Sequence, residues 1–155
     1  MDEWTPHDEQ LDALAATLDV DPATVLRALG GGWARCEVDS GVWPVDGWAH
    51  ATWFATGDPL QVLAGIDFRS LVLARPVIRW RGGVGVITAA EVREFAREDV
   101  AFQPELLADV VEELARRSRR RFRWCRTCRV PSAPEHMLDR DECMGCGARY
   151  RGLVH

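Results

Sequence analysis

The chain has 155 residues and a net charge of −5, is 47% hydrophobic, and has arginine at all nineteen of its basic positions. This length suits one moderate domain, or a domain of roughly 110 residues with a small metal-stabilised appendage. No apolar run approaches the roughly 20 residues of a membrane-spanning helix, and the acidic N-terminal sequence MDEWTPHDEQ lacks the basic and apolar regions of a secretory signal. We therefore expect a cytoplasmic protein with no membrane partner.

Charge divides the sequence into two parts. Residues 1–113 hold 8 Arg against 20 acidic residues, a net charge of −12, whereas residues 114–155 hold 11 Arg against 4 acidic residues, a net charge of +7. Opposed charges predict either docking of one part on the other or a basic region that binds an external polyanion. We expect an acidic α+β domain over residues 1–113 and an Arg-rich helix end with a metal module over residues 114–155.

Two short helices are predicted near the N-terminus. Thr5-Pro6 is a helix-start signal, and the leucines that follow share one face, which predicts a helix over residues 6–18. Asp21-Pro22 repeats this signal, and the second helix is expected to end at Gly30-Gly31-Gly32. Residues 6–29 are therefore predicted to form a helical hairpin.

The sequence LAATLDVDPATVLRAL, residues 14–29, resembles the helix-turn-helix of bacterial repressors. In that family the second helix lies in the DNA major groove, which here would present Thr24 and Arg27 to the bases. The family usually has Gly in the turn where this chain has Asp19. A helical hairpin that only covers the core is the alternative interpretation.

Tryptophan is concentrated in the next segment, residues 33–56, which holds four of the seven Trp residues. Turn-forming Gly and Pro residues interrupt the apolar positions, which predicts short strands and loops. The surroundings of Trp43 and Trp48 are interpreted either as an aromatic surface for a peptide or for stacked bases, or as packing beneath loops.

The middle of the chain is predicted to alternate between helix and hairpin. Asp58-Pro59 indicates a short helix over residues 59–65, and a β-hairpin is expected over residues 70–87 with its turn at Gly82-Gly83. The sequence TAAE is a capping box, which predicts a helix over residues 88–99. The predicted fold class is α+β, with a mainly helical N-terminal domain, a small β-hairpin and a long basic helix.

Gln103-Pro104 begins the longest predicted helix, over residues 104–122. Acidic residues precede basic ones along it, which complements the helix dipole. Five Arg occupy residues 116–121, and some lie four residues apart, where like charges repel, so an anionic partner is expected. The apolar stripe that should pack on the acidic domain consists of Leu107, Val110, Val111, Leu114 and Phe122.

Four cysteines form two C-x2-C pairs separated by fourteen residues: Cys125, Cys128, Cys143 and Cys146. In a reducing compartment such pairs are metal ligands more often than disulfides, and four soft thiolates predict a structural Zn²⁺ ion, with iron or an iron-sulfur cluster as the alternative. Residues 121–155 resemble a zinc ribbon, or alternatively a treble clef, with a closing strand over residues 148–154. Cys36 is left without a partner.

Four thiolates would leave the metal no open coordination position, so a catalytic role is not expected. Glu135 and His136, between the cysteine pairs, raise the alternative of an HNH-like nuclease, whose further Mg²⁺ ligands the sequence does not identify.

The arginines near the metal module are interleaved with aromatic residues, a mixture that suits nucleic acid because guanidinium groups bind phosphates and aromatic rings stack on bases. We therefore expect a non-enzymatic protein that contacts nucleic acid or a nucleoprotein complex, such as the transcription apparatus. The alternative is a protein-interaction adaptor in which the acidic, Trp-bearing domain binds a protein partner and the zinc site is purely structural. The predicted nucleic-acid-binding residues are Arg116, Arg117, Arg119, Arg120, Arg121, Arg123, Arg126 and Arg129.

Overall fold

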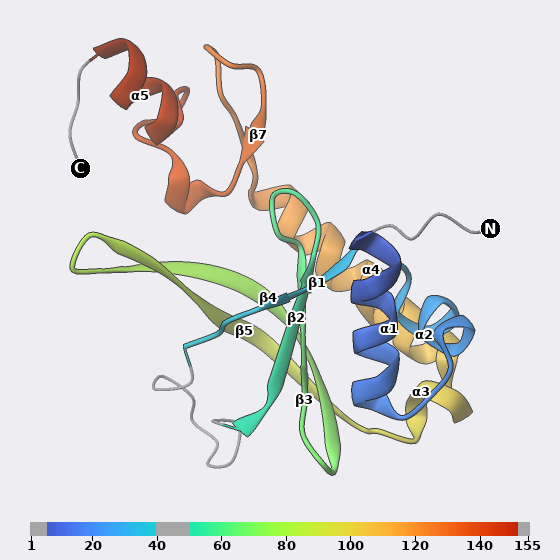
Figure 1. The fold of residues 1–155 in the computed structure, drawn as a ribbon. Helices are drawn as coiled ribbons and strands as arrows, with labels where there is room; N and C mark the ends of the chain where they lie inside the picture. Colours follow the sequence, from blue (N-terminus) through green and yellow to red (C-terminus); the bar gives the residue numbers. More distant parts are fainter. Residues whose placement is uncertain (1–5, 40–49, 152–155) are drawn as a thin grey trace.

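A computed structural model of the chain describes residues 6–39 and 50–151 (Figure 1). None of the helices in these ranges is long and apolar enough to cross a bilayer. The elements in chain order are α1 (Pro6–Leu18), α2 (Pro22–Leu29), β1 (Trp33–Cys36), β2 (Thr52–Thr56), β3 (Val62–Ile66), β4 (Ser70–Arg81), β5 (Val84–Ala96), α3 (Asp99–Phe102), α4 (Pro104–Arg121), β6 (Arg123–Trp124), β7 (Pro131–Ser132), the 3-10 helix η3 (Pro134–His136) and α5 (Met144–Arg151).

Strands β1 to β5 form one antiparallel sheet in which each strand pairs with the next in sequence. The sheet curls back on itself beyond β1. The backbone N–H of Asp39 donates to the carbonyl oxygen of Ile87 on β5 at 2.8 Å, and the Asp39 carboxylate pairs with Arg81 at 2.7 Å. Because the segment after the first strand reaches the last strand, the sheet is closed part of the way into a barrel.

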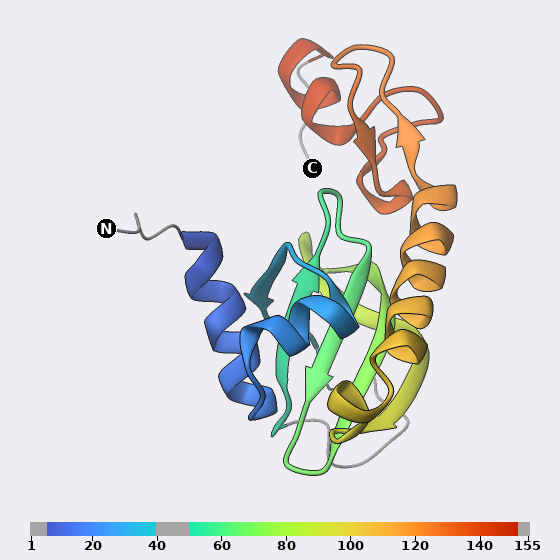
Figure 2. The same ribbon diagram turned by 90° about the vertical axis from the view of Figure 1, so that its right-hand side faces the viewer.

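Both faces of the central part of the sheet are buried. Helices α1, α2 and α4 cover one face (Figure 2), with Leu14, Phe54 and Leu107 among the completely buried side chains of that layer. The other face packs around Trp53 and Leu63. These layers explain why β3, buried along its whole length, is a continuous apolar run without alternation.

The helical hairpin, the long helix and the strand hairpin are confirmed at their predicted positions. The Asp21 carboxylate caps α2 by accepting a hydrogen bond from the Thr24 backbone N–H at 2.9 Å. Gly82 and Gly83 form the tight turn between β4 and β5. Their φ angles of 57° and 82° are positive, and residues with a Cβ atom rarely adopt such angles.

The helix predicted over residues 59–65 is wrong, because the segment begins in a turn and continues as strand β3 from Val62. Pro59 lies in the turn between β2 and β3 and not at the first position of a helix. The apolar residues that follow form a strand that pairs with β2 on one side and with β4 on the other.

The helix predicted over residues 88–99 is also wrong, because most of this segment belongs to β5. Pairing with β4 overrides the local capping signal, and one extra residue on β5 creates a bulge between the pairs formed by Leu73 and Arg75. Glu91 lies in this bulge with a φ angle of 52°. The N-terminal part is therefore not mainly helical, and its framework is the five-stranded sheet.

The closing strand predicted over residues 148–154 is wrong as far as residue 151, because the chain there belongs to helix α5. Gly147 lies within this helix, and a Cβ atom at this position would overlap the Leu138 side chain. The glycine thus permits the preceding loop to pack closely on the helix.

Helix α4 is held on the sheet by both apolar and polar contacts. Leu107 and Leu114 are completely buried, and the Ser118 hydroxyl donates to the Gln61 carbonyl oxygen at 2.6 Å. The change of charge sign between residues 113 and 114 falls within this single helix. The anchored part of the helix therefore extends into its basic half.

Ion pairs add a second set of contacts between α4 and the sheet. Glu91 accepts hydrogen bonds from Arg75 at 2.7 Å and from Arg117 of α4 at 2.8 Å. Glu113 accepts from Arg93 of β5 at 3.0 Å and from Arg117, four residues further along α4, at 3.2 Å. Arg117 therefore links two carboxylates, one on each element.

We predict that Leu107→Ala lowers the free energy of unfolding by about 2–5 kcal/mol, because it leaves a cavity between α4 and the sheet. Leu106→Ala is the matched control, since Leu106 is the neighbouring residue of the same helix and is 45% exposed; its effect should be about 0.5 kcal/mol or less. Urea unfolding followed by tryptophan fluorescence measures both. Equal effects of the two substitutions would contradict the placement of α4.

A pH dependence is predicted for Glu91. Its hydrogen bond to Arg75, and next that to Arg117, hold the pKa of this carboxyl below its usual range. Its contribution to stability is therefore complete above the unfolded-state pKa of about 4.3 and is lost as the pH falls through the lower folded-state value. The stability difference between the wild type and Glu91→Gln should shrink in acid.

Urea unfolding at a series of pH values from 7 downwards tests this dependence. Glu94→Gln makes the same chemical change at an exposed position of β5. At every pH its stability should differ from that of the wild type by less than the stability of Glu91→Gln does. A difference between wild type and Glu91→Gln that stays constant with pH would refute the role of the ionised carboxylate.

Candidate metal centre

The first cysteine pair lies in a tight turn between the short strands β6 and β7, which pair antiparallel. Cys125 is completely buried, whereas Cys128 is exposed. Arg129 follows with a φ angle of 60°, and its backbone N–H donates to the Cys125 carbonyl oxygen at 2.9 Å. This hydrogen bond closes the turn that directs both thiols towards the second pair.

The second cysteine pair lies at the start of helix α5. Cys143 immediately precedes the helix and Cys146 lies in its first turn, and residues three apart share a helix face. The loop before them is fixed by Asp139, whose side chain accepts hydrogen bonds from the backbone N–H groups of Asp141 and Glu142 at 2.8 and 2.9 Å. The loop thereby returns the chain to the first pair.

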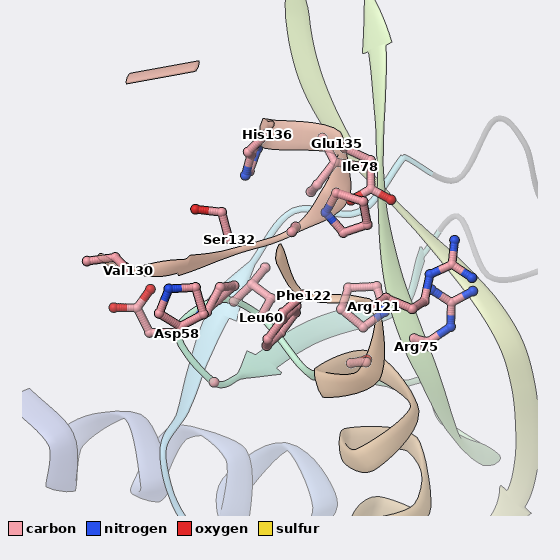
Figure 3. A pocket seen from close by; sticks show the side chains of 17 residues that line it. Asp58, Leu60, Arg75, Ile78, Arg121, Phe122, Val130, Ser132, Glu135 and His136 are labelled. Atoms are coloured by element: carbon pink, nitrogen blue, oxygen red, sulfur yellow. The ribbon is translucent and has the colours of Figure 1, made fainter. Parts of the chain in front are cut away.

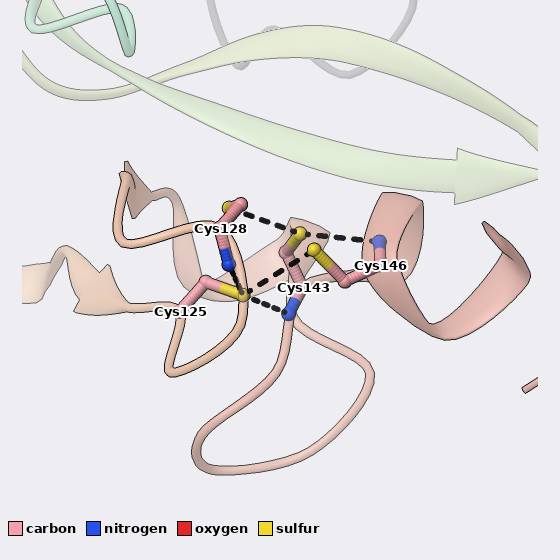
Figure 4. Close-up of side chains that lie close together, drawn as sticks. All are labelled: Cys125, Cys128, Cys143 and Cys146. Carbon is pink, nitrogen blue, oxygen red and sulfur yellow. Dashed lines mark hydrogen bonds between the residues drawn. The ribbon is translucent and has the colours of Figure 1, made fainter. Parts of the chain in front are cut away.

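The four sulfur atoms lie within 4.8 Å of one another (Figure 4). Cys125 Sγ is 3.7 Å from Cys146 Sγ, and Cys128 Sγ is 3.9 Å from Cys143 Sγ. A tetrahedral zinc ion with Zn–S bonds of about 2.3 Å separates its sulfur ligands by about 3.8 Å. The four thiols therefore fit a tetrahedral metal ion, and together they form the predicted metal cluster.

Backbone amides favour ionisation of one thiol in this cluster. The N–H groups of Cys128 and Cys143 donate to Cys125 Sγ at 3.5 and 3.4 Å and lower the pKa of that thiol to about 6. Burial, followed by the neighbouring thiols, raises the pKa of Cys146. Four thiolates this close repel one another, so a cation is needed to hold all of them ionised.

Cys36 lies on β1, outside this cluster, and packs against the apolar layer around Trp53. Burial, with a smaller contribution from Glu37, raises the pKa of its thiol to about 11. Cys36 is thus a protonated, partly buried side chain.

The arginines predicted to bind nucleic acid are all exposed, but they divide into two groups. Arg117 is paired with Glu91 and Glu113, and Arg119 is paired with Glu112 at 3.0 Å. The other six have no ion pair within residues 9–39 and 50–148, whose side chains the structure describes. These six, named here the open arginines, are Arg116, Arg120, Arg121, Arg123, Arg126 and Arg129.

The metal module touches the sheet through Trp80, a residue that the sequence did not single out as functional. The Trp80 indole N–H donates to the Glu135 carbonyl oxygen at 3.0 Å, and its ring lies edge-on to that of His136 with centroids 5.9 Å apart. The two residues considered for a nuclease site therefore contact the long β4–β5 hairpin. No local pattern around Trp80 indicates this long-range contact.

Helices α1 and α2, which carry the sequence that resembles a helix-turn-helix, form a helical hairpin with a left-handed Asp19 in the turn, at a φ angle of 56°. The two candidate base-contacting side chains are engaged within the chain. The Thr24 hydroxyl donates to Asp21 at 3.0 Å, and Arg27 pairs with Glu105 of α4 at 2.6 Å. Trp43 and Trp48, the candidate aromatic surface, lie outside the described residues.

Comparisons with protein-family models, with curated protein sequences and with solved structures gave no match. The functional assignment of this chain therefore rests on its own residues and geometry.

We predict that the purified protein contains about one zinc ion per chain and that Cys143→Ser weakens its retention, because the substitution removes one of four ligands. Amides of residues 123–148 should then exchange faster with solvent, while those of β2, β3 and β4 stay protected. Elemental analysis and hydrogen exchange measure these effects.

Cys36→Ser is the control for that experiment, because it removes a thiol outside the cluster and should leave the zinc content unchanged. Loss of protection throughout the sheet on Cys143→Ser would show instead that the module and the sheet unfold as one unit.

Proposed function

We propose that the protein binds nucleic acid through a basic surface formed by the C-terminal end of α4 and the metal module, with Zn²⁺ as a structural ion. The observation that carries this proposal is the set of six open arginines, which are exposed and have no carboxylate partner in the described part of the chain. Guanidinium groups of this kind bind phosphate oxygens in a bidentate manner.

The internal ion pairs sharpen this assignment. Two of the arginines in residues 116–121 have structural roles, because Arg117 pairs with Glu91 and Arg119 pairs with Glu112. Arg116 and Arg120 lie four residues apart on the same helix, a spacing at which like charges destabilise it unless an anion is bound. Within the described residues, neither arginine has a carboxylate of the chain as its partner. An external polyanion would therefore offset this repulsion.

The metal module supplies an aromatic side chain beside these arginines. Trp124 is 57% exposed and lies on strand β6, directly after Arg123 and directly before the first cysteine. An exposed aromatic ring next to guanidinium groups suits stacking on an unpaired base as well as contact with phosphates. The proposed surface therefore accommodates single strands in addition to duplexes.

Zinc is the proposed metal because the site offers four thiolates and the spacing of a tetrahedral ion. We propose that the module is a treble clef, the alternative to a zinc ribbon in the sequence analysis, because a turn with two cysteines is followed by a second pair at the start of a helix. With all four positions filled by sulfur, the ion would have no site for substrate, and we propose a non-enzymatic role.

Binding of mixed-sequence duplex and single-stranded DNA at several salt concentrations tests the proposal. For the zinc-loaded protein the logarithm of affinity should fall linearly with the logarithm of salt, with a slope near −0.9 per phosphate contact on duplex. A triple variant with Gln at positions 120, 123 and 126 should bind weakly, and its slope should be shallower by about one for each phosphate that it no longer neutralises.

The control is a triple variant with Gln at positions 35, 69 and 79, which removes the same charge from exposed arginines of the sheet domain. It should keep most of the affinity of the wild type. The proposal fails if neither DNA binds at low salt, or if both triple variants bind equally weakly.

A further inference from the structure

A cavity of about 380 Å³ lies where α4 meets the metal module (Figure 3). Its walls come from four separate segments: the turn at residues 57–60, strand β4, the end of α4, and residues 130–136 of the module. Small-molecule sites typically enclose roughly 300–1,000 Å³ and are mainly apolar with a few polar groups. This cleft has that size and that composition.

One end of the cleft carries two guanidinium groups, those of Arg75 and Arg121 (Figure 3). The Arg75 side chain is only 11% exposed, and its Nε is bonded to Glu91. Within the described part of the chain, its two Nη groups donate no hydrogen bond. Arg117 bonds the same carboxylate, and Arg121 lies one helical turn beyond it.

These positions leave an excess of positive charge at that end. Glu91 accepts from both Arg75 and Arg117, and Glu113 accepts from both Arg117 and Arg93. Arg121 has no carboxylate partner among the described residues, so four guanidinium groups lie near these two carboxylates. A largely buried guanidinium group with unused donors is costly unless an acceptor fills the space beside it. An anionic group between Arg75 and Arg121 would supply this acceptor.

The middle of the cleft is apolar, and its other end has a different polarity. Phe122, Leu60 and the prolines of residues 131–134 form flat, apolar walls. Asp58 and Ser132 lie away from the arginines (Figure 3), and a carboxylate there repels anions and accepts hydrogen bonds. Glu135 also lines the cleft, but it forms no ion pair with Arg75 or Arg121 within the described residues, so the two arginines favour an anionic group at their own end.

We infer that the cleft binds a small ligand that carries both an anionic group and a flat ring, the anion at Arg75 and Arg121 and the ring against Phe122 and the proline wall. A hydrogen-bond donor at the far end of the ligand would face Asp58 and Ser132. A mononucleotide has this chemistry, and so has an aromatic carboxylic acid. The site does not depend on the nucleic-acid surface proposed above, although Arg121 belongs to both.

Four probes added to the zinc-loaded, full-length protein test the inference: adenosine monophosphate, 2-naphthoate, adenosine and inorganic phosphate. Calorimetry gives each affinity, and amide shifts in NMR spectra locate the binding. At least one probe that combines ring and anion should bind on the order of tenfold more tightly than adenosine and phosphate and should shift amides of residues 57–60 and 130–136. The tighter of the two identifies the source of the ligand.

Arg121→Gln should weaken binding of that probe by about tenfold, because it removes a charge-assisted hydrogen bond. Arg120→Gln, the same change at the neighbouring exposed position that does not line the cleft, should alter it by less than about twofold. Ala133→Trp, which fills the cavity without a change of charge, should abolish it. Unchanged zinc content establishes that each variant is folded.

The inference is overturned if phosphate alone binds as tightly as the ring-bearing anions, if no probe shifts the cleft amides, or if the changes at positions 120 and 121 have equal effects. Ala133→Trp separates this result from the proposed function, because its open arginines are intact. If this variant loses the small ligand but keeps its affinity for DNA, the protein has two separate sites. If the wild type does not bind DNA, the proposed function fails but the inference about the cleft is unaffected.

Discussion

The packing of α4 on the curled sheet is the constraint on which the rest of the structure depends. Leu107 and Leu114 are buried against the sheet and Ser118 is bonded to the β2–β3 turn, so the helix is fixed almost to its last turn. The metal module begins only a few residues later, at β6. The position of the module, the direction of the arginines and the walls of the cleft all follow from this one anchored helix.

The division of charge along the sequence has two physical consequences in the folded chain. Some opposite charges meet within the molecule, as Arg117 does with Glu91 and Glu113, and these pairs fix the helix relative to the sheet. The open arginines remain on the surface, where they repel one another and attract anions. Docking of the basic part on the acidic part and binding of an external polyanion are therefore compatible, because different arginines are available for each.

Features set by short-range chemistry were predictable from the sequence, and features set by distant pairing were not. The cysteine cluster and α4 follow from residue spacing, and the structure has both. The capping box at residues 88–91 is a valid local signal, but a helix there would leave β4 without its long partner strand, so pairing prevails. The cleft joins four segments and has no local pattern at all.

The most direct test of the account is an NMR titration that follows the side-chain Nε–H signals of the arginines in the zinc-loaded protein as a short DNA is added. The account predicts that the open arginines from Arg116 to Arg129 shift, while those bonded within the chain, Arg93 and Arg117, shift least. Shifts confined to the sheet domain, or equal shifts at Arg117 and Arg120, would contradict it.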